Sequence, residues 1–280
     1  MMTPLPAVAA AVGALLAPAA PAAAAPAPAA PHSWCTTDRF GARTWPGGQI
    51  TYNNEWNSGS SQRMCANGPG NVRVVARQSA TGGARSCPVV LSYPAVQYDL
   101  PAPAGQPIPG TPIGKLREVR STYAESQPGY PKAIGEFASD DWWWVASQRG
   151  QEAYEVMSWE DNQGQSPGGT EWTGHAGHPK VITVAGHLYR LWDGGTLRGP
   201  APHGYYAFLR TTRAGRELHA TSGYVPHLAE ARWLIGHGLM DPGVTFAQEE
   251  IGWEICTDPP GGGTYRITAN RLTVRKQAGR

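Results

Sequence analysis

The chain has 280 residues, of which 16% are charged, and its formal net charge is +2. This length suits one large all-β domain, and the balanced charge excludes the basic surface that binding to nucleic acid or to a membrane requires. The 35 glycines suit many turns, and the 11 Trp and 11 Tyr residues far outnumber the 4 Phe residues. Trp and Tyr combine an apolar body with a polar group, which suits a surface that binds the flat, hydroxyl-rimmed face of a sugar.

The first 31 residues indicate a targeting segment rather than a part of the fold. Residues 7–16 form an apolar run, and Ala-Pro repeats with small residues follow, which offer several cleavage sites to a signal peptidase. The apolar run is too short, and too often interrupted by proline, for a membrane anchor. We therefore expect residues 1–31 to be a leader, residues 32–280 to form a single domain, and the mature protein to be a secreted, extracellular monomer.

The four cysteines of an exported chain predict two disulfides, for which three pairings are possible. Cys35 and Cys65 bracket the first expected strands, so a bridge between them would pin the N-terminal strand to its neighbour. Cys87 and Cys256 would then pair by elimination. No Cys-x-x-Cys spacing occurs, so a cysteine-rich zinc site is not expected.

Short runs of β-branched and aromatic residues, bounded by Gly, Ser and Pro, predict strands along most of the chain. They lie at residues 49–56, 71–76, 89–93, 140–145, 153–159, 204–211, 249–257 and 265–274. Residues 181–192 predict a hairpin that turns at Ala185-Gly186. Residues 99–130 are rich in Pro and Gly, which predicts a long loop over the sheet.

One segment alone shows apolar residues at helical spacing, between Ser222, a candidate N-cap, and Gly236 or Gly238, where the helix would end. One helix packed on many short strands predicts an all-β, two-sheet β-sandwich. If one sheet curves, its concave face becomes a substrate cleft that alternate residues of its strands line.

Two glutamates lie in the middle of predicted strands beside large apolar residues. Side chains alternate along a strand, so Glu155, Met157 and Trp159 fall on one face. In the later strand the apolar residues around Trp253 face the core, which leaves Glu254 on the other face, where Gly252 leaves room nearby. Two carboxyl groups lifted from a sheet into an aromatic-lined groove are the arrangement that glycosidic bond cleavage requires.

Acetal hydrolysis assigns different tasks to the two carboxyl groups. One must protonate the leaving oxygen and the other must carry negative charge at the anomeric carbon, so their protonation states must differ. Asp141 on the expected neighbouring strand would keep Glu155 ionised through a shared proton or hydrogen bond. Burial beside Trp253 and Ile255 would raise the pKa of Glu254.

Five motifs, in order, resemble glycoside hydrolase family 12, the compact endo-β-1,4-glucanases. Residues 52–56 resemble the family's Asn-Asn-x-Trp strand, residues 92–94 its Ser-Tyr-Pro, and residues 141–143 lie where the family has Tyr-Asp and a large apolar residue. Residues 154–159 resemble its Glu-(Leu/Ile/Val)-Met-x-Trp signature, and residues 252–255 resemble its Gly-(Phe/Thr/Trp)-Glu. The resemblance extends from about Cys35 to Val274, which is nearly the whole chain after the leader.

This resemblance implies a jelly roll, a retaining mechanism and no cofactor. Carried over to this sequence, it makes Glu155 the nucleophile, Glu254 the general acid/base and Asp141 the residue that supports the nucleophile. The residues that it implies for substrate binding are Asn54 and Trp56, on the non-reducing side of the cut, and Met157 and Trp159, in the cleft near the nucleophile.

The implied function is a secreted, retaining, endo-acting hydrolase of β-1,4-glucan, with cellulose, mixed-linkage glucan and xyloglucan as candidate polysaccharide substrates. A family-11-like xylanase and a non-catalytic carbohydrate-binding sandwich or lectin are the alternatives. Asp140, Ser158 and Cys256 depart from the family pattern, which bears on substrate preference more than on reaction type. His175 and His178 are three residues apart, but the Gly and Pro residues around them indicate a loop, so no metal site is expected.

Overall fold

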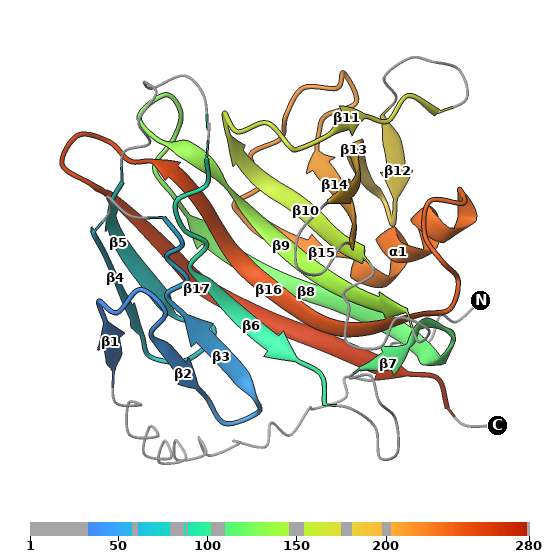
Figure 1. Cartoon of the computed structure of the whole chain (residues 1–280), viewed down its shortest axis with the longest axis horizontal. Coiled ribbons are helices and arrows are strands. Elements are labelled where there is room, and N and C mark those ends of the chain that lie inside the picture. The colour runs from blue at the N-terminus through green and yellow to red at the C-terminus, as the bar shows by residue number, and fades with distance from the viewer. Residues whose placement is uncertain are drawn as a thin grey trace, which may run out of the picture. The chain divides into compact units, whose positions relative to one another are not determined.

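The computed structural model describes residues 33–57, 61–78, 87, 89–101, 110–145, 154–174, 181–197 and 203–278. These residues form two β-sheets, one α-helix and a short 3-10 helix, η1 (Ile113–Lys115) (Figure 1). The expected leader lies outside the described residues, as do His175 and His178. Within the described part of the chain, no helix is long and apolar enough to cross a membrane.

The smaller sheet has six strands in the order β1-β4-β5-β17-β8-β15, all paired antiparallel. Its strands are β1 (Trp34–Thr36), β4 (Ser61–Ala66), β5 (Val72–Arg77), β8 (Leu116–Ser126), β15 (Ser222–Val225) and β17 (Gly263–Lys276). Cys35 and Cys65 are register partners in β1 and β4, and a disulfide joins them. A second disulfide joins Cys87 to Cys256.

The larger sheet has 11 strands, and its main path runs β11-β13-β14-β10-β9-β16-β6-β3-β2. Its strands are β2 (Ala42–Thr44), β3 (Gln49–Tyr52), β6 (Ala95–Asp99), β7 (Thr111–Pro112), β9 (Ile134–Val145), β10 (Tyr154–Gln163), β11 (Thr170–Glu171), β12 (Ile182–Val184), β13 (His187–Leu197), β14 (His203–Arg210) and β16 (Val244–Thr257). Three long strands, β10, β9 and β16, lie side by side at its centre (Figure 1).

Apolar side chains at alternate strand positions fill the space between the sheets. Trp253 on β16 is fully buried, and it belongs to one apolar cluster with Val74 of β5 and Tyr265 of β17. Burying a large apolar side chain contributes about 1.5–3 kcal/mol, so this face of β16 is committed to the core. The two-sheet sandwich with one helix is confirmed, and so is the core-facing position of Trp253.

The prediction of a long loop over residues 99–130 is wrong for the second half of that segment. Residues 116–126 form β8, which lies between β17 and β15 in the smaller sheet. Its buried and exposed residues alternate, with Leu116, Val119 and Tyr123 buried. Ser121 is also buried on this side, and polar residues lie on the other side. The sequence of this strand therefore lacks an uninterrupted alternation of apolar residues that would have predicted it.

The α-helix, α1 (His227–Gly236), begins later than the sequence indicated. Ser222 does not cap it, because residues 222–225 pair with β8 as β15. The predicted hairpin is confirmed: Val184 pairs with His187, and the turn between them has positive φ at Ala185 (49°) and Gly186 (86°). Residues 89–93 do not form the expected strand; Ser92 alone makes isolated bridges, to Glu55 and to Ile255.

Candidate active site

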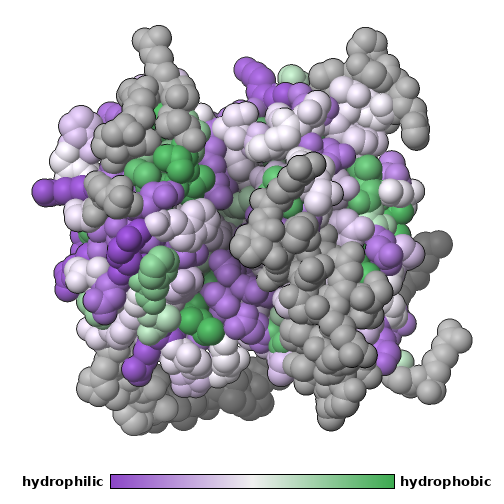
Figure 2. All heavy atoms as spheres, in the orientation of Figure 1, coloured by the Kyte–Doolittle hydropathy of each residue, from purple (hydrophilic) through white to green (hydrophobic). Residues whose placement is uncertain are grey.

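The central strands of the larger sheet present a row of carboxyl groups on the face that points away from the core, which we call the cleft face. The register pairs Glu254 of β16 with Glu136 of β9, and Glu250 of β16 with Asp140 of β9. Glu155 of β10 joins this face as the partner of Trp142 of β9. The space-filling view shows the surface hollowed between its left and right parts, with hydrophilic and hydrophobic residues side by side (Figure 2).

Met157 and Trp159 follow Glu155 on the same face of β10, as the alternation predicted. They belong to a buried apolar cluster with Tyr205 and Leu209 of β14, and only 2% of Met157 and 1% of Trp159 is exposed. They therefore form a filled floor beneath the cleft face rather than an open platform on which a sugar ring could stack.

Glu155 is half-buried and has a histidine partner that the sequence did not indicate. Its Oε2 lies 2.7 Å from Nε2 of His203, at the start of β14. The edge of the Trp142 ring contacts the imidazole of His203, with 5.0 Å between the ring centroids. This arrangement fixes the direction of the Glu155 carboxyl group.

Asp141 does not lie beside Glu155, which corrects the sequence prediction. It pairs with Val156, whose side chain faces the core, and its Oδ2 lies 2.6 Å from Nδ1 of His227 in α1. The preceding residue, Asp140, occupies the cleft face instead. The prediction failed by one residue, because a shift of one position along a strand moves a side chain to the opposite face.

Asp140 interacts electrostatically with Glu155. Burial raises the pKa of Asp140 well above its usual range, and the charges of Glu155 and then Glu250 raise it further. One carboxyl oxygen of Asp140, Oδ1, is buried and has no hydrogen-bond partner among the described residues. Burial and the neighbouring charges therefore both favour the protonated form of Asp140. Burial, followed by the charges of Asp99 and Glu155, likewise raises the pKa of Glu250 to about 7.

Glu254 has an environment different from that of Glu155. Burial raises the pKa of Glu254 to about 7, and the charge of Glu155 adds to this shift. The side-chain amide of Gln165 donates a hydrogen bond to Oε2 of Glu254, which acts in the opposite direction. A carboxyl group that titrates near neutrality can both give and take a proton. Gly252 opens no room beside it, because a Cβ there would lie 2.2 Å from the carbonyl oxygen of Pro94.

Asn54 and Trp56 lie beyond the end of β3, and 43% of Trp56 is exposed. The indole Nε1 of Trp56 donates a hydrogen bond of 2.5 Å to Oδ1 of Asn54. The Trp56 ring lies 6.4 Å from that of Tyr93, whose hydroxyl is 3.1 Å from the carbonyl oxygen of Glu250. Trp56 is thus an open aromatic surface one side chain away from the carboxyl groups.

On the other face of β9 and β16, polar side chains form a buried group between the sheets. We call it the core-face cluster; its members are Ser121, Asp141, Ser158, Glu160, Arg210, His227, Glu230 and Glu249. Ser158 donates a hydrogen bond of 2.7 Å to Glu230 of α1, which explains a hydroxyl where the family pattern has an aliphatic residue.

Part of the core-face cluster has the composition of a metal site. Asp141, His227 and Glu230 each offer a ligand atom, and these atoms lie within 4.8 Å of one another. Each side chain also has a protein partner: His227 pairs with Asp141, and Ser158 donates to Glu230. The other carboxyl oxygen of Glu230, Oε1, is buried and has no hydrogen-bond partner among the described residues.

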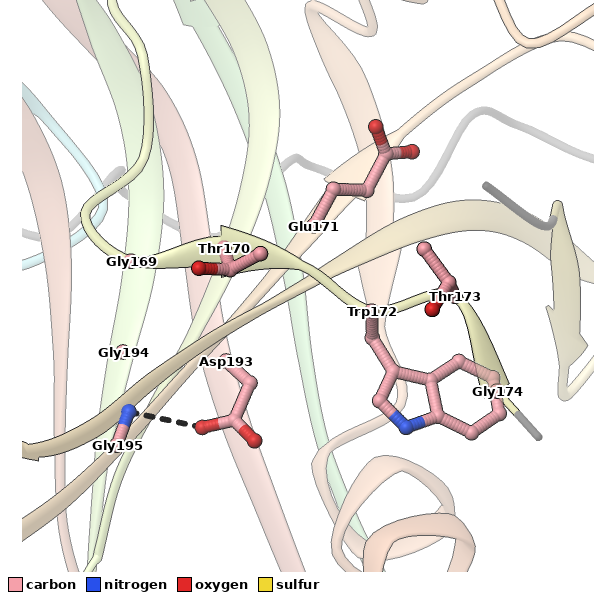
Figure 3. Close-up of a pocket in the computed structure, with 9 residues that line it drawn as sticks. All are labelled: Gly169, Thr170, Glu171, Trp172, Thr173, Gly174, Asp193, Gly194 and Gly195. Carbon is pink, nitrogen blue, oxygen red and sulfur yellow. Dashed lines mark hydrogen bonds between the residues drawn. The ribbon is translucent and has the colours of Figure 1, made fainter. Parts of the chain in front are cut away.

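A separate hollow of about 490 Å³ lies at the edge of the larger sheet, between β11 and β13. Figure 3 shows Thr170, Glu171 and Trp172 on one side and Asp193 on the other, where Oδ1 of Asp193 accepts a hydrogen bond from the backbone of Gly195. Neither Glu155 nor Glu254 lines this hollow. It is therefore distinct from the row of carboxyl groups.

Four residues of this site were not predicted from the sequence: Glu136, Asp140, Glu250 and His203. Period-two alternation over residues 136–142 would have placed the first two on one face with Trp142, but the predicted strand began only at residue 140. His203 precedes the predicted strand at residue 204, and only the three-dimensional pairing of β14 with β10 brings it to Glu155.

No protein-family model and no curated protein matches the sequence, but solved structures of similar fold do. The xyloglucanase domain of NopAA, a type three effector from Sinorhizobium fredii in complex with cellobiose, has a TM-score of 0.67 and 20% identity, over 88% of this chain and 100% of that chain. The family 12 xyloglucanase from Bacillus licheniformis has a TM-score of 0.66 and 16% identity, over 86% and 100%. Trichoderma harzianum endoglucanase 3, from family 12, has a TM-score of 0.67 and 16% identity, over 89% and 100%. The fold is the β-jelly roll of glycoside hydrolase family 12.

Proposed function

We propose that the protein is a retaining, endo-acting glycoside hydrolase that cleaves β-1,4-glucan. The observation that carries the proposal is the pair Glu155 and Glu254 on the cleft face of a family 12 jelly roll. Their environments differ in the way that the reaction requires: Glu155 is paired with His203, whereas the pKa of Glu254 is raised to about 7. Glu254 therefore retains a proton near neutrality, as a general acid requires.

In the first step Glu254 protonates the leaving glycosidic oxygen while the Glu155 carboxylate attacks the anomeric carbon. The bond between that carbon and the leaving oxygen breaks, and a covalent glycosyl ester forms on Glu155. In the second step Glu254, now a carboxylate, takes a proton from a water molecule, which attacks the same carbon and releases Glu155. Asp140 takes the supporting role that the sequence gave to Asp141, because it lies on the cleft face and interacts electrostatically with Glu155.

The substrate class rests on the cleft and on the proteins of similar fold. Those proteins include a xyloglucanase domain in complex with cellobiose and an endoglucanase, which favours a β-1,4-linked glucose backbone. Trp56 offers the open ring on which a sugar face can stack, and its hydrogen bond to Asn54 holds the indole in place. Secretion through residues 1–31 and a monomeric state complete the proposal, and the two disulfides fit an oxidising compartment.

Turnover on a panel of polysaccharides tests this proposal. Carboxymethylcellulose, mixed-linkage β-glucan, xyloglucan and xylan are assayed for release of reducing ends with the parent, Glu155→Gln and Glu254→Gln. We expect the parent to cleave at least one glucan and both variants to lose almost all turnover. Near-parental turnover in either variant would refute the role of that residue. Activity on xylan alone would favour a xylanase, and binding without cleavage would favour a carbohydrate-binding module.

A further inference from the structure

The carboxyl group of Glu136 faces the proposed acid/base and has no other role in the proposed reaction. Glu136 is the direct register partner of Glu254 across β9 and β16, so the two side chains leave the sheet side by side on the cleft face. Glu136 is fully buried, and neither of its carboxyl oxygens has a hydrogen-bond donor among the described residues. A buried carboxylate without a donor is strongly disfavoured.

Two ionised carboxylates cannot hydrogen-bond to each other, because both are only acceptors. One proton between them removes both problems: it neutralises one group and supplies a hydrogen bond to the other. Glu254 also accepts a hydrogen bond from the amide of Gln165. Asn162 holds the backbone of Gln165: its Oδ1 accepts from the Gln165 backbone N–H at 3.0 Å, and its Nδ2 donates to the Gln165 backbone carbonyl oxygen at 2.9 Å.

The position of the proton follows from the burial of the two groups. Glu136 is fully buried, whereas Glu254 is partly exposed, so negative charge is better solvated on Glu254. Burial, and then the charge of Glu254, raises the pKa of Glu136 well above its usual range, whereas the pKa of Glu254 is about 7. The other titratable groups around the pair are Asp140, Glu155 and Glu250 and the hydroxyls of Tyr93 and Tyr205.

We propose that Glu136 is a positioning residue that stays protonated while Glu254 is ionised and donates a hydrogen bond to the Glu254 carboxylate. It stabilises the form that Glu254 takes after it has protonated the leaving group and before it accepts a proton from water. The inference rests on the proposed function for its role in catalysis, but the shared proton is a property of the folded protein alone.

Carbon NMR of protein labelled at the glutamate carboxyl carbons tests the shared proton without substrate. Signals are assigned by their loss in Glu136→Gln and in Glu254→Gln. We expect the Glu254 signal to titrate near neutrality while Glu136 remains protonated, and we expect Glu136 to ionise at lower pH in Glu254→Gln. An ionised Glu136 beside a protonated Glu254 would overturn the proposal, and so would independent titration of the two groups at ordinary values.

Two replacements at residue 136 separate hydrogen bonding from packing. Glu136→Gln keeps a neutral N–H donor, so the pKa of Glu254 should stay within about half a unit of the parent value. Glu136→Leu removes the donor, so that pKa should rise by about one unit. Glu250→Gln, on the same strand and face as Glu254, is the matched control and should shift it by less than half a unit. A fall of more than one unit in Glu136→Gln would mean that Glu136 is ionised in the parent.

The same variants report the catalytic role through the pH profile of kcat/KM on the best glucan of the panel. We expect the alkaline limb to move to higher pH by about one unit in Glu136→Leu and to stay in place in Glu136→Gln. If the NMR titration of Glu254 shifts in Glu136→Leu but the alkaline limb does not move, the role of Glu136 in catalysis is refuted and the shared proton is not. Loss of the NMR shift itself would refute the inference even if the parent is a glucanase.

Discussion

Two consecutive aspartates of β9 lie on opposite faces of one sheet and meet opposite conditions. Asp141 faces the core and pairs at 2.6 Å with His227, which also lies 3.3 Å from Glu249. Asp140 faces the cleft among other carboxyl groups, and one of its oxygens has no partner among the described residues. The core-face cluster therefore contains ion pairs to His227 and Arg210, whereas among the described residues no such partner lies beside Asp140.

This difference indicates what each face is for. Pairing with His227 and Arg210 suits groups that hold α1 and the sheet together. Unpaired acids with raised pKa values are typical of groups that exchange protons with a substrate. Variants of the cleft face should therefore change turnover more than stability, and variants of the core-face cluster should do the reverse.

The largest effect is expected for Glu155→Gln. The variant keeps the shape of the side chain but cannot attack the anomeric carbon, so kcat should fall by at least about 10³-fold. The free energy of unfolding should change by less than about 0.5 kcal/mol, because Glu155 is half-buried and lies outside the core. Reducing-end assays and urea denaturation measure the two effects. Comparable turnover with lower stability would remove Glu155 from the chemistry.

Asp140→Asn and Asp141→Asn compare the two faces directly. Asp140→Asn replaces an acid that interacts electrostatically with Glu155 by an amide that cannot ionise, so kcat/KM should fall by about 10-fold with little loss of stability. Asp141→Asn removes one of the two carboxylates that face the buried His227. The free energy of unfolding should therefore fall by about 3 kcal/mol. The kcat of this variant per folded molecule should be close to that of the parent. If Asp141→Asn instead lowers kcat more than Asp140→Asn does, the assignment of faces to roles is wrong.

Stability should fall as the pH rises from about 6.5 to 9. Burial raises the pKa of Glu230 to about 7 and that of Glu160 to about 8, so the folded state holds protons that the unfolded state has lost. Burial lowers the pKa of His227, but Asp141 and Glu249 outweigh this and raise it well above 6.5. The contribution of His227 to stability is therefore complete below pH 6.5. It is lost as the pH rises through the pKa that His227 has in the folded protein.

For each proton that the folded state binds in excess of the unfolded state, the free energy of unfolding falls by about 1.4 kcal/mol when the pH rises by one unit. Urea denaturation at a series of pH values measures the slope, and Glu160→Gln should reduce it because that variant cannot ionise. A stability that is flat or rises over this range would show that these carboxyl groups are ionised in the folded state.

The smallest of these effects is expected for Trp56→Ala. Truncation removes an exposed ring at the margin of the cleft face, which should raise KM for the best glucan by about 10-fold because stacking on an aromatic ring contributes about 1 kcal/mol or more. The value of kcat should change little, since the ring lies away from the carboxyl groups. Trp56→Tyr keeps a stacking surface and should recover most of the binding. An unchanged KM in Trp56→Ala would exclude this ring from substrate contact.

Local periodicity was enough to predict which face each glutamate occupies. Trp253 faces the core and so Glu254 cannot, and the same alternation places Glu155 on the side of Met157 and Trp159. The two-sheet fold and the hairpin at Ala185-Gly186 also follow from local patterns. Both depend on features that a strand or a turn carries in its own few residues.

Features that depend on pairing between distant segments could not be predicted. The choice between Asp140 and Asp141 requires the register of β9 against β10 and β16, which no single strand encodes. The burial of Trp159 depends on side chains of β14 that cover it. The strand β8 lacks an apolar stripe because its inward positions include Ser121, which contacts Glu249 of β16.

In the proposed reaction a carboxylate on the cleft face, at residue 155, attacks the anomeric carbon. An activated 2-deoxy-2-fluoro-cellobioside slows the second step of a retaining reaction, so the glycosyl ester accumulates and can be located by peptide mass spectrometry. We predict a single added fluorocellobiosyl group on Glu155 in the parent and none in Glu155→Gln. A label on another carboxyl group, or turnover of glucan without any label, would contradict the account.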